Sequence, residues 1–216
     1  MIGGEPLRLR AIRIALGARE LVAGLDAEID PGTCLTLMGP SGCGKSTLLA
    51  YLAGTLDPVF AASGEVRVGE DELSCLAPEK RGLGILFQDD LLFPHLSVGG
   101  NLAFALPAAW RGRAERRARV DAALEEAGLP GCAEADPATL SGGQRARVAL
   151  MRTLLAEPRA LLLDEPFNKL DTRLRGEFRA FVFDHARQRR LPVLMVSHDE
   201  ADAAAAGGPL IRLGGA

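Results

Sequence analysis

Eight consecutive residues have the types and spacing of a loop that binds phosphate. Gly39-Pro40-Ser41-Gly42-Cys43-Gly44-Lys45-Ser46 fits the pattern G-x-x-x-x-G-K-[ST] without a mismatch. Its glycines permit backbone geometries that turn successive N–H groups toward phosphate oxygens. Lys45 adds a positive charge directed at the β- and γ-phosphates, and the hydroxyl of Ser46 can ligate Mg²⁺. A chance match is the alternative, but the loop lies between an apolar strand and an apolar helix, as phosphate binding requires.

Two adjacent carboxylates follow a strongly apolar run. Residues 160–163 read Ala-Leu-Leu-Leu, which predicts a buried strand, and Asp164 and Glu165 come directly after it. Beside a phosphate loop, Asp164 would hold Mg²⁺ through water. Glu165 would act on the attacking water as a general base or as an orienting acceptor. The alternative is that this acidic end only caps the next helix, and the phosphate loop in the same chain favours the catalytic interpretation.

The pentad Leu140-Ser141-Gly142-Gly143-Gln144 suits a second contact with phosphate. Ser141 and Gln144 precede an apolar helical pattern, so they also fit a capping box that opens an amphipathic helix. Capping does not explain Gly142 and Gly143, because each weakens a first helical turn by about 1 kcal/mol relative to alanine. Two glycines there let a ligand approach the backbone closely, and a γ-phosphate drawn by the helix N-terminus fits. We therefore expect the pentad to bind nucleotide.

Three more polar residues follow or precede expected elements. Gln88 follows a short apolar run and could ligate Mg²⁺ or contact the water, although a glutamine there is most often a surface residue. His198 follows another apolar run and could hydrogen-bond the γ-phosphate, although a lone histidine is more often structural. Asp171 is expected to cap a helix, and its place after Glu165 also suits a contact between subunits. Beside the phosphate loop, we favour the functional interpretation of His198.

Strands and helices alternate along most of the chain, which predicts an α/β fold with a parallel, doubly wound sheet. The expected strands are Leu7–Ile14, Glu20–Ile29 broken by Gly24, Cys34–Met38, Glu65–Val68, Gly84–Phe87, Ala160–Leu163, Val193–Val196 and Pro209–Leu213. The expected helices are Ser46–Ala53, Arg113–Ala127, one beginning after Ser141, one over about 171–189, and Asp199–Ala206. Between residues 89 and 140 prolines and glycines interrupt the pattern, and we expect an inserted helical subdomain there within a single domain spanning residues 1–216.

Composition limits the classes of function. With 216 residues, 48% hydrophobic and 25% charged, the chain is typical of a soluble globular protein. Its net charge of −3 argues against general affinity for nucleic acid. Its four cysteines form no C-x-x-C pair, which favours a reduced cytosolic setting. The first residues lack the features of a signal peptide, and no apolar run approaches the roughly 18 residues that cross a bilayer, so we expect any membrane role to be peripheral.

These motifs, in this order, resemble those of the ATP-binding subunits of ABC transporters, and the resemblance covers nearly the whole chain. It implies a P-loop NTPase of the ABC type, with a mostly parallel sheet core, an N-terminal antiparallel β portion and the inserted helical subdomain. Residues 1–88 and 141–216 would then form a RecA-like core with the N-terminal β region. The implied cofactors are ATP and Mg²⁺.

The resemblance also assigns residues. The loop Gly39–Thr47 is similar to the Walker A loop, Leu140–Gln144 to the signature, and Gln88 to the Q-loop glutamine. Asp164 and Glu165 are similar to the Walker B aspartate and the catalytic glutamate, Asp171 to the D-loop residue, and His198 to the switch histidine. Catalysis would then fall to Glu165, His198 and Gln88, and Mg²⁺ to Ser46, Gln88 and Asp164. The implied nucleotide-binding residues are Gly39, Pro40, Ser41, Gly42, Cys43, Gly44, Lys45, Ser46, Thr47, Ser141, Gly142, Gly143, Gln144 and Asp171, with Leu16 near the base.

Residues 87–98 resemble the importer branch that handles sulfate, polyamines, iron or thiamine. By this resemblance two subunits, expected to be a homodimer, face each other head to tail with ATP between Lys45 of one and Ser141 of the other. Gln88 and the helical insert would contact coupling helices of permease membrane subunits, and a substrate-binding protein would complete the importer. The expected location is the cytoplasm, peripheral on the inner face of the cell membrane, and no nucleic acid partner is expected.

Three features depart from the family pattern. The family often stacks adenine on an aromatic residue at the position of Ile14, Ala15 or Leu16, and no aromatic precedes Tyr51, so base selectivity is expected to be loose. The chain ends one strand after His198, so we expect no regulation through a C-terminal domain. Residues 168–169 are Asn and Lys in place of the small residues usual in the D-loop.

Other classes of protein are open at this point. A soluble ABC-type ATPase could act on DNA or ribosomes, but the interval between Lys45 and Ser141 is too short for the coiled coil of the DNA-repair branch. Translation factors of this type carry two cassettes on one chain. The ATPase of an ABC exporter is a further alternative. A small-molecule P-loop kinase would leave Ser141–Gln144 and His198 unexplained.

Overall fold

The computed structural model describes residues 4–214 and contains one parallel and one antiparallel β-sheet. All neighbouring strands of the parallel sheet run in the same direction, which confirms the predicted α/β fold. In spatial order they are β6 (Leu83–Leu86), β7 (Ala160–Asp164), β8 (Val193–Val196), β3 (Cys34–Met38) and β9 (Leu210–Arg212). Because the carboxyl ends of parallel strands meet at one edge, the segments after β3, β6, β7 and β8 converge there. Met1–Gly3, part of the segment assessed for a signal peptide, lie outside the described residues.

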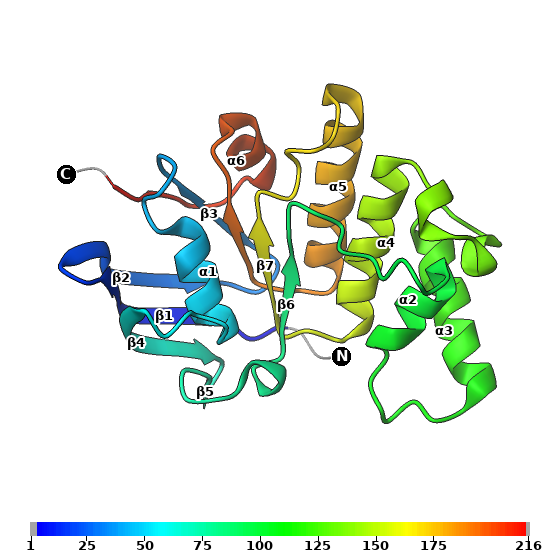
Figure 1. Ribbon diagram of the computed structural model, residues 1–216, viewed down its shortest axis with the longest axis horizontal. Coiled ribbons are helices and arrows are strands. Elements are labelled where there is room, and N and C mark those ends of the chain that lie inside the picture. Colours follow the sequence, from blue (N-terminus) through cyan, green and yellow to red (C-terminus); the bar gives the residue numbers. More distant parts are fainter. Residues whose placement is uncertain (1–3, 215–216) are drawn as a thin grey trace.

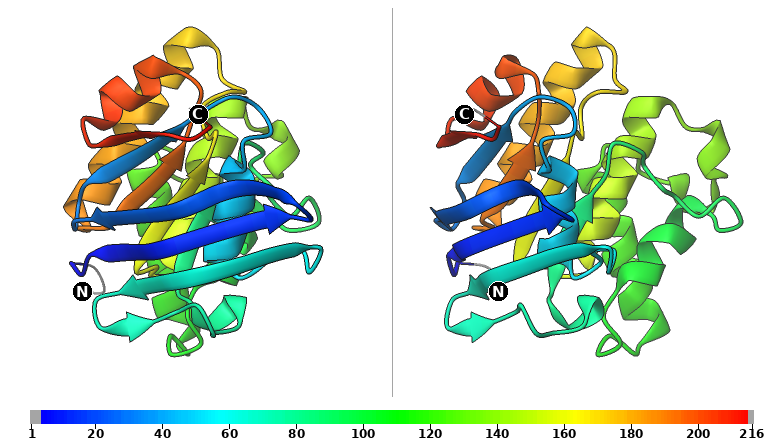
Figure 2. Two further views of the ribbon diagram at one scale, coloured as in Figure 1. Left: turned by 90° about the vertical axis from the view of Figure 1, so that its left-hand side faces the viewer. Right: turned by 60° about the vertical axis from the view of Figure 1, so that its left-hand side comes forward.

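The second sheet is antiparallel and faces the viewer in the left panel of Figure 2. Its order is β2 (Arg19–Ile29), β1 (Leu7–Leu16), β4 (Phe60–Val68) and β5 (Asp71–Glu72). The predicted break of β2 at Gly24 is wrong. Leu25 pairs with Ile12 and Ala23 with Arg13, so Gly24 is an extra residue in a bulge, at φ 77°, and the strand continues.

Four helices flank the parallel sheet: α1 (Lys45–Ala53), α4 (Gly142–Leu155), α5 (Thr172–Gln188) and α6 (Glu200–Ala206). Between β6 and α4 the chain forms α2 (Val98–Ala105), α3 (Arg113–Glu126) and two short 3₁₀ turns at Cys132–Glu134 and Pro137–Thr139, while a third such turn, Pro78–Lys80, precedes β6. Figure 1 shows α2 and α3 at one end of the molecule, beyond α4, and the antiparallel sheet at the other. Within residues 4–214, no helix combines the length and the hydrophobicity that crossing a bilayer demands.

Helix α2 had no counterpart among the expected elements, because Gly99-Gly100 in its first turn suggests a loop. A Cβ at Gly99 would lie 2.9 Å from the carbonyl oxygen of Ala133, so the glycine lets the following 3₁₀ turn pack directly on the helix. The side chain of Ser97 caps the helix by accepting a hydrogen bond from the N–H of Gly100 at 3.1 Å. The formation of this helix therefore depends more on tertiary packing than on the helix propensity of its own residues.

Strand β7 is buried on both faces and separates two apolar cores. Ala160 and Leu162 belong to the core shared with α1 and the antiparallel sheet, and Leu161 and Leu163 to the core shared with α4 and α5. This explains why its sequence is a continuous apolar run, as expected for a strand covered on both sides. Packing on both faces fixes where the strand ends, and therefore where Asp164 and Glu165 emerge.

A buried arginine anchors the helix that follows the glycine loop. Arg81 is 5% exposed, and its Nη1 donates to the carbonyl oxygens of Tyr51 and Leu52, both at 2.7 Å, at the end of α1. Its Nη2 donates to the Ser74 carbonyl at 2.8 Å and its Nε to the Leu76 carbonyl at 2.9 Å. Burial lowers the pKa of this guanidinium below its ordinary value. The side chain thus gives the Leu52 carbonyl a donor at the helix end, where carbonyls lack intrahelical partners, and adds a second donor to the Tyr51 carbonyl, which also accepts from the N–H of Gly54 at 3.1 Å.

Arg81→Ala is expected to lower the free energy of unfolding by about 3 kcal/mol, because it leaves buried carbonyls unpaired and a cavity behind. Arg81→Lys should recover only part of the loss, since one ammonium cannot reach all these carbonyls. Urea unfolding followed by circular dichroism measures the effect. The matched control is Arg10→Ala, at an exposed position, which should change stability by less than about 0.5 kcal/mol. Equal unfolding midpoints for Arg81→Ala and the control would contradict the anchoring role.

Candidate functional site

The glycine loop connects β3 to α1 and is closed by its own lysine. Lys45 is 7% exposed, and its Nζ donates to the carbonyl oxygens of Gly39 at 2.7 Å and Pro40 at 3.0 Å. Gly44 precedes the helix at φ 97°, a conformation that favours glycine. A Cβ at Gly39 would lie 2.5 Å from the carbonyl oxygen of Leu213, which requires glycine there as well. The loop therefore curls around the lysine at the start of a helix.

Other loop residues line the same turn. Pro40, Ser41 and Gly42 are exposed, Thr47 is half-buried, and Cys43 is 9% exposed. The N–H of Cys43 donates to the Pro40 carbonyl at 3.3 Å. The loop thus presents its outer residues to solvent above the N-terminal end of α1, where the helix dipole favours an anion.

The hydroxyl that follows the lysine contacts the carboxylate at the end of β7. Ser46 Oγ donates to Asp164 Oδ1 at 3.2 Å, across 118 positions of sequence. Burial is the largest cause that raises the pKa of Asp164 above its ordinary value, while the hydrogen bond from Ser46 acts in the opposite direction. The two oxygens are ligands of the kind that Mg²⁺ takes, so the pair fits that ion.

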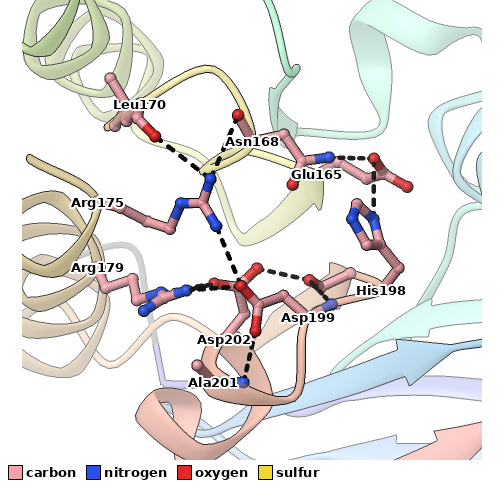
Figure 3. Close-up of polar contacts among 10 residues, drawn as sticks. Glu165, Asn168, Leu170, Arg175, Arg179, His198, Asp199, Ala201 and Asp202 are labelled. Carbon is pink, nitrogen blue, oxygen red and sulfur yellow. Dashed lines mark hydrogen bonds and ion pairs between the residues drawn. The ribbon is translucent and has the colours of Figure 1, made fainter. Parts of the chain in front are cut away.

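Glu165 and His198 lie side by side, as Figure 3 shows. His198 Nδ1 lies 3.4 Å from Glu165 Oε2, and the amide Nδ2 of Asn168 donates to the same carboxylate oxygen. Glu165 has φ 47°, in the left-handed region that costs a non-glycine residue of order 1–3 kcal/mol, and its N–H donates to the Val196 carbonyl at 3.0 Å. The backbone therefore turns sharply at Glu165, and this turn directs its side chain toward the histidine.

A charged network joins the two segments that carry Glu165 and His198 (Figure 3). Arg175 Nη1 donates to Asp199 Oδ2 at 3.1 Å, and Arg179 Nη2 lies 3.2 Å from the same oxygen. Arg179 also pairs with Asp202, which is 1% exposed and accepts a hydrogen bond from Ser197 Oγ at 2.5 Å. The network therefore ties α5 to the turn that begins at Ser197.

Asp199 is charged in this network. The N–H of Ala201, which donates to Asp199 Oδ1 at 2.8 Å, is the largest cause that holds the pKa of Asp199 below its ordinary value. The charges of Arg179 and Arg175 lower that pKa further. The carboxylate thus caps α6 and pairs with both guanidinium groups at the same time.

The pentad opens α4 with the capping box that was the alternative interpretation. Gln144 N–H donates to Ser141 Oγ at 3.3 Å, and Ser141 N–H donates to Gln144 Oε1 at 2.8 Å. Ser141 and Gly142 are exposed, and Gly143 is buried against Leu174. Capping accounts for the serine and the glutamine, and an exposed Gly142 leaves the first turn of α4 open to a ligand.

Helices α1 and α4 do not meet within this chain. In Figure 1, β6 and β7 stand between them. The glycine loop before α1 and the pentad before α4 are therefore two separate surfaces of one copy.

Gln88 is exposed, two residues after β6. The two acidic residues that follow it are paired: Asp89 with Lys169 of the segment after β7, and Asp90 with Arg145 of α4 at 2.8 Å. A cavity of about 300 Å³ lies between these three segments and is lined in part by Gln88, Gly142 and Lys169. The segment after Gln88 therefore contacts both the start of α4 and the loop after Glu165.

Asp171 caps α5, as expected, by accepting a hydrogen bond from the N–H of Leu174 at 3.0 Å, and its side chain is exposed. Leu16 is 42% exposed at the end of β1, and the strand register places it opposite Phe60. An aromatic side chain is thus a neighbour of Leu16 although none precedes Tyr51 in sequence. Strand register, which is a tertiary feature, is the only signal for that proximity.

Sequence reasoning missed further contacts of the candidate site. Arg19 Nη2 donates to the carbonyl of Gly42 at 3.2 Å, from β2 to the glycine loop. Asn168 holds Glu165, and Arg175 reaches Asp199. No motif marks Arg19 or Arg175, because their partners lie on other elements, and the comparison that singled out Asn168 gave no sign that it contacts Glu165.

Comparison with known proteins identifies related sequences. Residues 22–168 match the family model described as ABC transporter. The chain is 50% identical over 199 residues, 92% of its length and 91% of the relative's, to the uncharacterized ABC transporter ATP-binding protein YnjD of Escherichia coli.

Two further relatives carry the word import in their names. The chain is 38% identical over 195 residues, 90% of its length, to the sn-glycerol-3-phosphate import ATP-binding protein UgpC 2 of Agrobacterium fabrum. It is 39% identical over 207 residues, 96% of its length, to the maltose/maltodextrin import ATP-binding protein MalK of Vibrio parahaemolyticus. These matches cover 52% and 55% of the two relatives, so the chain spans about half the length of each.

Proposed function

This chain belongs to the ABC transporter family as an ATP-binding subunit with ATPase activity, and from that premise we propose that two copies close head to tail on ATP and so power solute import. Each ATP would lie between the glycine loop of one copy and Ser141–Gln144 of the other. Closure on ATP and opening after hydrolysis would move the membrane subunits to which the pair is attached.

One observation carries the two-copy proposal: the separation of α1 and α4 within one chain. In Figure 1, β6 and β7 lie between the two helices, and the helices pack in different apolar cores. The loop that leads into α1 and the pentad that opens α4 are therefore suited to contact two different nucleotides of a pair rather than one nucleotide within a single copy. Both surfaces nevertheless have features that suit phosphate, since each lies at the N-terminal end of a helix. A second copy that faces the first brings the two surfaces together.

The roles of the site residues follow from this arrangement. The backbone N–H groups of the loop Gly39–Thr47, in which only Pro40 lacks one, and the Lys45 ammonium would bind the β- and γ-phosphates. Glu165 would take the proton of the attacking water, and His198, 3.4 Å from that carboxylate, would donate to the γ-phosphate. Asp171, exposed at the start of α5, would contact the partner copy. Leu16, exposed at the end of β1, would touch the base.

Mg²⁺ would be held by Ser46, Gln88 and Asp164. A hydroxyl, an amide oxygen and a carboxylate are suitable ligands, and the contact between Ser46 and Asp164 supports their pairing around an ion. Bound there, the ion would supply positive charge to the β- and γ-phosphate oxygens.

The import assignment has support from the names of the relatives. Both UgpC 2 and MalK are import ATP-binding proteins. We further propose that residues 89–140 are a helical subdomain that contacts permease subunits, with residues 1–88 and 141–216 as the core. The chain would then lie in the cytoplasm, peripherally on the inner face of the membrane, and a substrate-binding protein would deliver the solute.

Purification of the affinity-tagged Glu165→Gln chain from detergent-solubilised membranes in the presence of ATP tests the transport role. We expect an integral membrane permease to be recovered in stoichiometric amount. The Lys45→Ala chain, carrying the same tag, is the control and should recover less permease if closure on ATP strengthens the assembly. Recovery of ribosomes or DNA with no membrane protein would contradict the proposal and favour a soluble ATPase.

A further inference from the structure

Helix α5 directs two arginines, one turn apart, at the residue beside His198. Arg175 and Arg179 both contact Asp199 Oδ2, at 3.1 and 3.2 Å. Arg175 also hydrogen-bonds to the segment after Glu165, where its Nη2 donates to the carbonyl oxygens of Asn168 at 3.5 Å and Leu170 at 3.3 Å. Arg179 instead lies over the ring of Phe167 in that segment, with its Cζ 5.8 Å from the ring centroid. The two guanidinium groups therefore share one acceptor but differ in their other contacts.

Arg175 bridges two loops that carry the proposed reacting groups. Asn168, whose carbonyl accepts from Arg175, donates through its amide to Glu165. Asp199, which pairs with Arg175, follows His198 directly in the chain. From one guanidinium, a path of two contacts thus leads to Glu165 and a path of one contact leads to the neighbour of His198 (Figure 3).

The position of the His198 side chain depends on the backbone of the loop that carries it. Its side chain is 60% exposed, so packing restrains it little, whereas Arg175 and Asp199 are each only 28% exposed. A guanidinium presents its donors in a rigid planar fork, which a lysine ammonium cannot reproduce across several acceptors. Arg175 is therefore suited to hold the two loops at a set separation.

We propose that Arg175 is a positioning residue of the ATPase reaction, which sets the separation of Glu165 and His198 by joining the loops that carry them. The proposal rests on the roles proposed above for Glu165 and His198. A purely structural role for Arg175 would predict a loss of stability with no selective effect on the rate of hydrolysis.

The first test compares Arg175→Lys with Arg173→Ala, a control on the same helix whose side chain is 80% exposed and pairs with Glu177. The chain concentration is set high enough that hydrolysis per chain no longer rises with it. Arg175→Lys should then lower kcat between about 10- and 100-fold, because a displacement of about 1 Å has effects of that size. KM for ATP should stay within about twofold of the wild type, because the phosphate loop is untouched. Arg173→Ala should change neither constant.

The second test asks whether Arg175 acts through His198. In a His198→Ala background, measured by single-turnover hydrolysis over hours, Arg175→Lys should change the rate by less than about twofold, because the separation that it sets no longer matters. Backbone amide hydrogen exchange gives a second readout that needs no activity. Arg175→Lys should speed exchange at residues 167–171 and 197–200, and Arg173→Ala should not.

Asp199→Asn weakens the contact between Arg175 and Asp199 by changing the acceptor instead of the donor, and it keeps the Oδ1 that caps α6. It should reproduce the loss of kcat even if Arg175→Lys fails to fold. The inference is overturned if both variants keep the kcat of Arg173→Ala, if Arg175→Lys raises KM with kcat unchanged, or if its effect is equally large without His198. Full turnover by Glu165→Gln would instead overturn the proposed roles, whereas an inactive Glu165→Gln beside an active Arg175→Lys would overturn this inference alone.

Discussion

Glu165→Gln is expected to lower ATP turnover by about 10³-fold, the size of effect that follows the loss of a general base. An amide cannot take the proton of the attacking water. Its oxygen can still accept the hydrogen bond that Asn168 donates, so the loop should keep its structure. ATP binding should persist, and the chain should accumulate as an ATP-bound dimer because opening requires hydrolysis.

Steady-state hydrolysis and light scattering after size-exclusion chromatography measure the two effects together. The matched control is Glu28→Gln, a carboxylate 54% exposed in an ion pair with Arg8 on the antiparallel sheet. It should show wild-type turnover and no stable dimer. If Glu165→Gln stays monomeric in ATP and keeps wild-type turnover, Glu165 is not the base and closure does not depend on it.

Lys45→Ala is expected to weaken ATP binding by about 100-fold. The ammonium now donates to the carbonyls of Gly39 and Pro40, within reach of the phosphates that the loop would bind. Hydrogen bonds to charged groups contribute about 1.5–3 kcal/mol each, so loss of one or two accounts for an effect of this size. Turnover should fall with binding.

Titration with a fluorescent ATP analogue measures the affinity, and thermal melting separates a binding defect from unfolding of the loop. Lys80→Ala, at an exposed lysine in the short 3₁₀ turn Pro78–Lys80, is the matched control and should bind ATP like the wild type. An unchanged ATP affinity of Lys45→Ala would contradict the assignment of the glycine loop to the ATP-binding site.

The parts of the site that could be predicted from sequence are those in which local pattern and chemistry coincide. Strand β7 is a continuous apolar run because both of its faces are covered, and its carboxylates follow where the run ends. The capping box at Ser141 is likewise a contact between residues three positions apart. Contacts of this kind depend on few residues and on no distant partner.

The remaining contacts depend on the packing of distant elements. Arg175 meets Asp199 across 24 positions, and Leu16 meets Phe60 only through the register of two strands. Gly24 was expected to break its strand, and it forms a bulge instead. A lone glycine in a strand pattern fits either outcome until the partner strand is known. Helix α2 depends on the close approach of a later turn to Gly99.

The central claim is that ATP is held between two copies of this chain, and its most direct test is hydrolysis per chain measured against chain concentration. Mass photometry of the same samples gives the fraction of dimer at each concentration. We expect hydrolysis per chain to fall in proportion to concentration wherever monomers predominate, because each site needs Lys45 of one copy and Ser141 of another. A rate per chain that stays constant through a range in which all particles have the monomer mass would contradict the account.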